Sequence, residues 1–203
     1  MTDDFLSRVY NLASQAETDA FYSEWASSYD RELIANGYRS PARCAAALAQ
    51  FVATDRPVLD VGCGTGLSGV ALAQAGFTEL FGQDVNADMV EIARRRNLYK
   101  TLSIADVTDP FRFEPGTYDA LAAIGVIGLG AAPPSFLDEC LQALAVGGHL
   151  VLSYNDHVLE HDAYMSALDK ALADGLAIEV FSEHGPHIEK LGSGSQVYVL
   201  RRT

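Results

Sequence analysis

Residues 58–69, VLDVGCGTGLSG, decide the fold class of this chain of 203 residues. The stretch begins with Val58–Val61, a short apolar run that is typical of a buried strand. It leads into Leu67–Ala75, for which we predict a helix that Gly76 terminates. A strand, a tight glycine-rich turn and a helix in this order begin a β–α–β unit, which indicates a parallel sheet.

The same alternation continues along the chain. Further strands are predicted at Leu80–Val85, Thr101–Ala105, Tyr118–Val126 and His149–Tyr154, and further helices at Asn86–Asn97 and Pro133–Ala145. This order is typical of an α/β fold with helices on both faces of a parallel sheet. The last two predicted strands, Ala177–Phe181 and Gln196–Leu200, are separated by a loop rich in glycine and serine. Because no helix is predicted between them, we expect an antiparallel hairpin that closes the sheet.

Two helices are expected before the first strand. One runs from about residue 18 to Gly37, and the other spans Ser40–Val52 with a proline in its first turn. The first helix carries on one face the aromatic residues Phe21, Trp25 and Tyr29. Such a stripe packs against a core or, at its end, reaches a ligand. We expect one domain over residues 1–203, with residues 1–55 as a helical extension or lid and residues 56–203 as the binding core.

The charge balance limits the partners. Lys and Arg total 14 against 27 acidic residues, which gives a formal net charge of −13. This argues against nucleic acid and anionic membrane, because phosphate binding draws on clustered Lys and Arg. The basic runs Arg94–Arg96 and Arg201–Arg202 are short, and the first falls on a predicted helix end, where cations suit the helix dipole.

Cysteine usage and the chain's N-terminal sequence favour a cytoplasmic protein. Cys44, Cys63 and Cys140 form neither a metal or redox motif nor a disulfide framework. No apolar signal-peptide region is expected near residue 1, and the most apolar stretch, 121–134, is too short to span a bilayer. No metal site is proposed, and a monomer is the expected state.

The glycine-rich turn is suited to ligand binding. Positions without side chains let backbone N–H groups and a helix N-terminus approach a ligand closely. Asp60 stands at the carboxyl end of the first strand, the edge where open α/β sheets bind ligands. Gly64, Gly66 and Gly69 also satisfy the dinucleotide pattern G-x-G-x-x-G. Asp60 would repel a pyrophosphate, and no separate substrate domain is expected, so a nicotinamide cofactor is only a remote alternative.

Two more acidic residues follow the next two strands. Asp84 ends the second strand and is placed to accept hydrogen bonds from ribose hydroxyls, as its counterpart does in dinucleotide folds. Asp106 follows the third strand and is placed near an adenine edge, although it can equally be a solvated loop residue. The apolar residues beside them, which can wall such a ligand, are Val85, Met89 and Val107.

Five segments resemble motifs of the class I S-adenosylmethionine-dependent methyltransferases. They are DVGCGTG (60–66), GQDVNADMVEIAR (82–94), ADVTD (105–109), YDALAAIGV (118–126) and LAVGGHLVLSY (144–154). The segment FYSEWASSYDRELIANGYRSP (21–41) is similar to the start of the methyltransferase-like proteins named for the Williams–Beuren syndrome chromosome region. The resemblance implies a Rossmann-like, doubly wound sheet of seven strands, mostly parallel, with one antiparallel strand near the C-terminus.

The resemblance also implies S-adenosylmethionine as cofactor and S-adenosylhomocysteine as product. By this likeness Gly62, Gly64 and Gly66 line the methionine moiety, Asp84 holds the ribose and Asp106 the adenine amino group. Tyr29 would lie over the methionyl end of the cofactor. Asp60, Val85, Met89, Val107 and Ile124 complete the set of expected cofactor-binding residues.

The methyl acceptor is expected to be a small molecule. The fourth strand ends in Ile124–Ile127 and lacks the Asn/Asp-Pro-Pro-aromatic sequence of methyltransferases that act on nucleic-acid or glutamine amino groups. Methyl transfer requires a general base only if the acceptor must lose a proton. His157, after the fifth strand, is the best single base candidate but a weak one, and the alternative is a loop histidine in water. His184 and His187 are expected in the loop of the terminal hairpin. The alternative from another class is a non-catalytic S-adenosylmethionine-binding protein.

Overall fold

The computed structural model describes Phe21, residues 28–111 and residues 113–203. Thr18 and Trp25, where the first helix was expected to begin and to carry its aromatic stripe, lie outside these residues. Among the described residues, the first helix with a defined range is α3 (Tyr29–Asn36). Gly37 terminates it in the left-handed conformation, at a φ of 76°. It is followed by α4 (Ser40–Leu48), which has Pro41 in its first turn.

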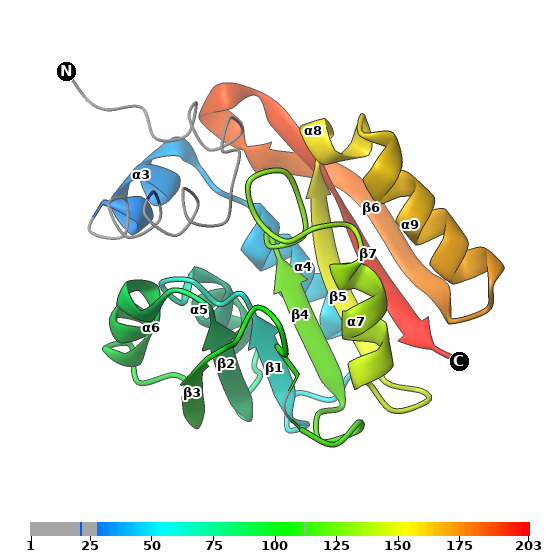
Figure 1. Cartoon of the computed structure of the whole chain (residues 1–203). Coiled ribbons are helices and arrows are strands. Elements are labelled where there is room, and N and C mark those ends of the chain that lie inside the picture. Colours follow the sequence, from blue (N-terminus) through cyan, green and yellow to red (C-terminus); the bar gives the residue numbers. More distant parts are fainter. Residues whose placement is uncertain (1–20, 22–27, 112) are drawn as a thin grey trace.

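The described strands form one seven-stranded sheet (Figure 1). In chain order they are β1 (Val58–Val61), β2 (Leu80–Asp84), β3 (Thr101–Ile104), β4 (Ala120–Ile124), β5 (His149–Asn155), β6 (Ala177–Ile188) and β7 (Ser193–Arg202). Their order across the sheet is β3-β2-β1-β4-β5-β7-β6. Pairing is parallel from β3 to β5, and β7 is antiparallel to both of its neighbours. The predicted fold class is therefore confirmed.

Helices cover both faces of the sheet. Those after β1 are α5 (Leu67–Gln74), α6 (Ala87–Arg94), α7 (Phe136–Ala143), α8 (Asp156–Leu159) and α9 (Asp162–Ala173). Side chains alternate along each strand, so Leu59 packs in the core beneath α7 and α9, whereas Val58 packs in the core beneath α4 and α5. Figure 1 shows α7 and α9 on one face of the sheet and α4 on the other. The central strands β1 and β4 are therefore buried on both faces, as their apolar sequences predict, whereas the edge strands β3 and β6 are largely exposed.

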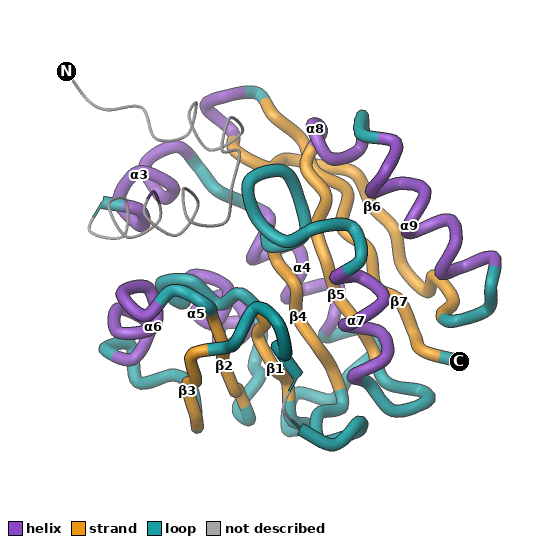
Figure 2. Tube along the Cα trace, viewed as in Figure 1, coloured by secondary structure: helices purple, strands orange, loops and turns teal. Residues whose placement is uncertain are grey.

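The C-terminal third departs from the sequence prediction. Strands β6 and β7 are longer than expected, and the short 3-10 helix η2 (Glu189–Leu191) joins them in place of a long loop. The expected loop position of His184 and His187 is therefore wrong, because both residues lie in β6. The helices α8 and α9 were not predicted. Figure 2 shows the far end of the hairpin reaching toward α3, and η2 contacts that helix.

The strand order places a crevice at one edge of the sheet. The chain moves outward from β1 to β2 and β3, and then returns to the other side of β1 with β4. Connections therefore run in opposite directions on either side of β1, and the carboxyl ends of β1 and β4 flank a topological switch point, where open α/β sheets bind ligands.

Candidate functional site

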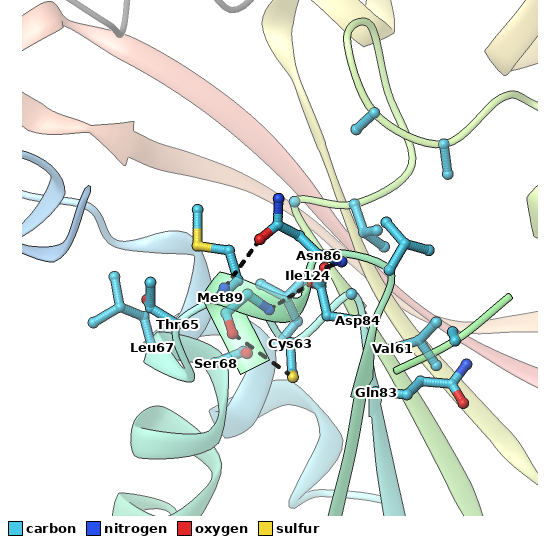
Figure 3. Close-up of a pocket in the computed structure, with 18 of the residues that line it drawn as sticks. Val61, Cys63, Thr65, Leu67, Ser68, Gln83, Asp84, Asn86, Met89 and Ile124 are labelled. Carbon is cyan, nitrogen blue, oxygen red and sulfur yellow. Dashed lines mark hydrogen bonds between the residues drawn. The ribbon is translucent and has the colours of Figure 1, made fainter. Parts of the chain in front are cut away.

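A cavity of about 350 Å³ lies at this switch point, within the usual range for small-molecule sites. Its walls come from the segments that follow the first four strands, from the loop before α7 and from the N-terminal segment. Figure 3 shows Asp84, Asn86, Met89 and Ile124 around the hollow. The fold thus brings together residues that lie more than a hundred positions apart in the sequence, such as Tyr29 and Phe136.

The glycine-rich turn forms one wall. Gly62, Gly64 and Gly66 all have a positive φ, at 64°, 53° and 88°. Residues other than glycine rarely adopt this backbone conformation. A Cβ on Gly62 would lie 2.3 Å from Cγ2 of Val126, so glycine is also required there by close packing. A Cβ on Gly64 would meet no atom within 4 Å, which leaves open space at this position.

Asp84 is at the end of β2 and lines the cavity. Its Oδ2 accepts the backbone N–H of Gly64 at 2.8 Å, and its Oδ1 accepts the backbone N–H of Asn86 at 2.8 Å. Each carboxylate oxygen has two lone-pair sites, so a single backbone donor does not exhaust the acceptor capacity of either oxygen. The carboxylate therefore fixes the glycine-rich turn while remaining a suitable ribose acceptor.

Asp60 is buried behind the cavity and is absent from the lining given by the described residues. Its Oδ2 accepts the hydroxyls of Ser68 and Tyr99, each at 2.6 Å, and its Oδ1 is buried without a hydrogen-bond partner in the described structure. The pKa of Asp60 is raised to about 7, chiefly by burial and to a smaller extent by the nearby Asp84, while the two hydroxyl donors oppose the shift. The expected direct contact between Asp60 and a cofactor is therefore not visible in the cavity wall.

The contact with Tyr99 explains the third glycine of the dinucleotide pattern. A Cβ on Gly69 would lie 2.2 Å from the Tyr99 hydroxyl, so glycine here makes room for the tyrosine that donates to Asp60. A pyrophosphate ligand is not needed to account for Gly69. The G-x-G-x-x-G match consequently gives little support to a nicotinamide cofactor.

Most of the expected cofactor-binding residues line the cavity. They are Tyr29, Gly62, Gly64, Asp84, Val85, Met89, Val107 and Ile124. Gly66 and Asp106, like Asp60, are not among the described residues that line the cavity, so their expected contact with a cofactor stays a prediction. At Gly66 a Cβ would meet the Arg96 side chain at 2.9 Å, so this glycine makes room for an arginine. Asp106 is exposed and accepts from the backbone N–H and the hydroxyl of Thr108.

None of the histidine candidates lines the cavity, as far as the described residues show. His157 is exposed on α8, and His184 on β6 pairs with Asp156 at 2.9 Å. His187 is 7% exposed, and its Nδ1 shares a hydrogen bond of 2.8 Å with the hydroxyl of Ser40. Burial lowers its pKa to about 4, so it is neutral at physiological pH. A role of His157 as a base stays a prediction that the geometry does not favour.

The sequence did not indicate that Tyr38 and Pro41, which precede the first strand, line the cavity. Tyr38 and Pro41 line the cavity beside Gly125 and Val126 at the end of β4. The Tyr38 ring packs edge-on against His187 with centroids 5.4 Å apart, and a Cβ on Gly125 would lie 2.8 Å from its hydroxyl. No local signal marks Tyr38, because the strand ends that surround it are distant in sequence.

The described residues include neither a metal-binding cluster nor a membrane-spanning helix. In this part of the chain no group of three or more His, Cys, Asp or Glu side chains is arranged to hold a metal ion. Its helices are all too short or too polar to cross a membrane.

Known proteins match the chain in sequence. Residues 58–148 match a family model described as a methyltransferase domain. Methyltransferase-like protein 27 of Homo sapiens is 34% identical over 149 residues, which cover 71% of this chain and 60% of that protein. The ubiquinone biosynthesis O-methyltransferase of Xylella fastidiosa (strain 9a5c) is 30% identical over 115 residues, which cover 55% of this chain and 46% of that protein. The chain thus spans 46–60% of the length of these relatives.

A solved structure shares the fold. The Burkholderia thailandensis 1,6-didemethyltoxoflavin-N1-methyltransferase, with bound 1,6-didemethyltoxoflavin and S-adenosylhomocysteine, has a TM-score of 0.67 at 18% identity. The match covers 95% of this chain and 92% of that chain, and at this identity it bears on the fold alone. The sheet order and the glycine-rich turn are those expected of the class I S-adenosylmethionine-dependent methyltransferase fold, and residues 58–148 are similar to a methyltransferase domain. The likeness to methyltransferase-like protein 27 is in keeping with the expected resemblance to methyltransferase-like proteins.

Proposed function

We propose that the protein binds S-adenosylmethionine in the cavity and transfers its methyl group to a small-molecule acceptor. The observation that carries this proposal is the arrangement of Asp84 and Gly64, which places a carboxylate and an open, side-chain-free turn at one edge of the cavity. An adenosyl ligand needs ribose acceptors and a close approach of the backbone, and both are available here.

The residues of the cavity fit such a ligand at several points. Gly62 and Gly64 would face the methionyl end, and Asp84 would accept the ribose hydroxyls. Val85 and Val107 are 40% and 56% exposed, and an adenine ring would cover apolar surface of this kind.

The opposite end of the cavity would receive the acceptor. Its walls are Tyr38, Ile124, Gly125, Val126 and Phe136, which are mostly apolar. Bound S-adenosylmethionine supplies an activated methyl group, so the chief task of these residues is to align the acceptor atom with it. An apolar pocket suits a small or partly apolar acceptor, and it offers few contacts to a nucleic acid. The Xylella fastidiosa relative is an O-methyltransferase of ubiquinone biosynthesis, which supports the same class of acceptor.

The remaining expectations are parts of the same proposal. The protein would act as a cytoplasmic monomer, with residues 1–55 as a lid over the core. A non-catalytic S-adenosylmethionine-binding protein is the alternative, because the cofactor residues alone do not require transfer.

Calorimetric titration of the purified protein with S-adenosylmethionine, S-adenosylhomocysteine and NAD tests the proposal. Micromolar binding of both adenosyl ligands, with none for NAD, supports it, whereas binding of NAD alone overturns it. A screen of fractionated metabolite pools for S-adenosylhomocysteine release then separates enzyme from binding protein. Release that depends on one fraction identifies the acceptor, and transfer to a DNA or RNA oligomer would contradict the small-molecule assignment.

A further inference from the structure

Arg96 differs from the two arginines that precede it. Arg94 and Arg95 have side chains that are 56% and 74% exposed, and both pair with Glu91 on their own helix. The Arg96 side chain is 24% exposed and leaves α6 to contact two other segments. The helix-end interpretation of the basic run therefore holds for Arg94 and Arg95, but Arg96 has more specific contacts.

Arg96 joins Asp30 and Thr65 in one cluster. Its Nε donates to the backbone carbonyl of Thr65 at 2.6 Å, and its Nη2 donates to the carboxylate of Asp30. The hydroxyl of Thr65 in turn donates to Oδ1 of Asp30 at 2.5 Å. All three contacts are part-buried, and charge-assisted hydrogen bonds are strong where water is partly excluded. The cluster thus ties the end of α6, the glycine-rich turn and α3 together.

The sequence of the turn accommodates this arginine. Gly66 is the third alternating glycine, and it lies outside the described lining of the cavity. A Cβ at this position would lie 2.9 Å from Cδ and 3.2 Å from Nε of Arg96. The side chain of Arg96 therefore passes directly over Gly66 on its way to Thr65 and Asp30, and glycine leaves the space that it needs.

The other end of α3 is fixed to the C-terminal hairpin. The backbone N–H of Glu189 donates to the carbonyl of Gly37, and that of Arg39 donates to the carbonyl of His187. An exposed ion pair of 2.8 Å joins the side chains of Arg39 and Glu189. The helix is consequently held at both ends, and Tyr29, next to Asp30, lies in the cavity wall.

We propose that Arg96 is a positioning residue for the cofactor. Through Asp30 and Thr65 it holds the first turn of α3, and with it Tyr29, against the glycine-rich turn, so that the bound ligand is released slowly. This inference rests on the proposed function for its ligand. The contact between α3 and the turn can nevertheless be tested without any ligand.

The experiment compares Arg96→Gln with Arg95→Gln, which removes an exposed charge from the same run and serves as a matched control. Hydrogen exchange of the α3 amides in the free protein reports the contact. The dissociation rate of S-adenosylhomocysteine, measured by stopped-flow displacement, reports its effect on the ligand. We expect Arg96→Gln to speed α3 exchange and ligand dissociation about tenfold each, and Arg95→Gln to leave both within twofold of wild type.

Further variants test whether the residues act together. Asp30→Asn should resemble Arg96→Gln, and the double variant should dissociate no faster than either single one, because the contact is already lost. The charge-swapped double variant, Asp30→Arg with Arg96→Asp, should restore the ion pair in part, so its ligand dissociation rate should lie between those of Arg96→Gln and wild type. Thermal unfolding of each variant shows that the core remains folded.

Each result decides one point. If Arg96→Gln speeds α3 exchange but leaves the dissociation rate at the Arg95→Gln value, the residue is merely structural and the positioning role is wrong. Unchanged exchange overturns the contact itself. If the wild-type protein binds no adenosyl ligand, the proposed function fails and the cofactor-positioning role fails with it, while the exchange data still decide whether Arg96 holds α3.

Discussion

The Asp84 carboxylate accepts the backbone N–H of Gly64 at 2.8 Å, which joins the end of β2 to the glycine-rich turn. The same carboxylate accepts the backbone N–H of Asn86 at 2.8 Å, next to the start of α6. One side chain therefore sets the distance between two walls of the cavity. A ligand that bridges these walls depends on Asp84 in two ways, through direct hydrogen bonds and through the position of the turn.

Replacement of Asp84 is expected to weaken adenosyl binding in a graded manner. Asp84→Ala removes acceptors whose charged hydrogen bonds contribute about 1.5–3 kcal/mol each, so the Kd of S-adenosylmethionine should rise at least about tenfold. Asp84→Asn keeps one acceptor oxygen and should have an intermediate Kd. Calorimetric titration measures both, with thermal unfolding as the control for the fold. An Asp84→Ala protein that binds as tightly as wild type would contradict the ribose role.

Alanine at Gly62 and Gly64 should have different consequences. The Gly62→Ala methyl group would collide with Val126, and together with the left-handed backbone this should lower the free energy of unfolding by about 3 kcal/mol. Gly64→Ala meets open space, so only the backbone cost of about 1 kcal/mol is expected. Its methyl group lies in the cavity wall, so S-adenosylmethionine binding should weaken more than stability does.

Urea denaturation and calorimetric titration of the two variants separate these effects. Val126→Ala in the Gly62→Ala background should recover part of the lost stability, because it removes the nearest methyl group. Equal stability losses in the two single variants would show that the collision with Val126 is relieved by a backbone shift.

The elements of the sheet were predictable because their signals are local. Val58–Val61 and the glycines after it combine a buried strand with a turn that needs positive φ, and short-range sterics decide both. The carboxyl-edge position of Asp84 then follows from the strand alone. Asp106 shows the limit of that argument, since a strand end fixes where the backbone is and not which way the next side chain points.

The features that the sequence did not predict depend on distant contacts. Arg96 meets Asp30, which is 66 positions away, and nothing in the run Arg94–Arg96 distinguishes it from its neighbours. The continuation of β6 through His187 depends on pairing with β7, which overrides the glycine and proline in that segment. The helix α9 was within reach, because Tyr164, Leu168 and Ala171 are spaced for one buried face.

Asp60 is expected to give the protein a stability that decreases as the pH rises from about 4 to 7. Its pKa is raised to about 7 in the folded state, so folding favours the protonated carboxyl. The stabilisation is complete below the unfolded pKa near 4 and is lost as the pH rises through 7, by a few kcal/mol in all, on the order of 1.4 kcal/mol per pKa unit. Asp60→Asn, which cannot ionise, should lack this decrease.

Urea denaturation at several pH values between 4 and 8 measures the difference. The free energy of unfolding of Asp60→Asn minus that of wild type should grow with pH across this window. A constant difference would mean that the carboxyl is not protonated on folding. Ser68→Ala removes one donor to the same oxygen and should leave the direction of the effect unchanged.

His187 should produce the opposite dependence in the same pH range. Burial lowers its pKa from 6.5 to about 4, with Arg43 and His157 adding to the shift and Asp156 opposing it. The contribution of neutral His187 to the free energy of unfolding is fully present above pH 6.5 and is lost as the pH falls toward 4, by about 3 kcal/mol.

His187→Asn should lose some stability at every pH, because the contact with Tyr38 is gone, yet it should lack the decrease in stability toward acid pH. Denaturation curves from pH 4 to 7 test this, with the exposed His161→Asn as the control that keeps the wild-type slope. If His187→Asn and wild type decline in parallel toward pH 4, the histidine is protonated in the folded protein and the network with Ser40 must rearrange to accept the charge.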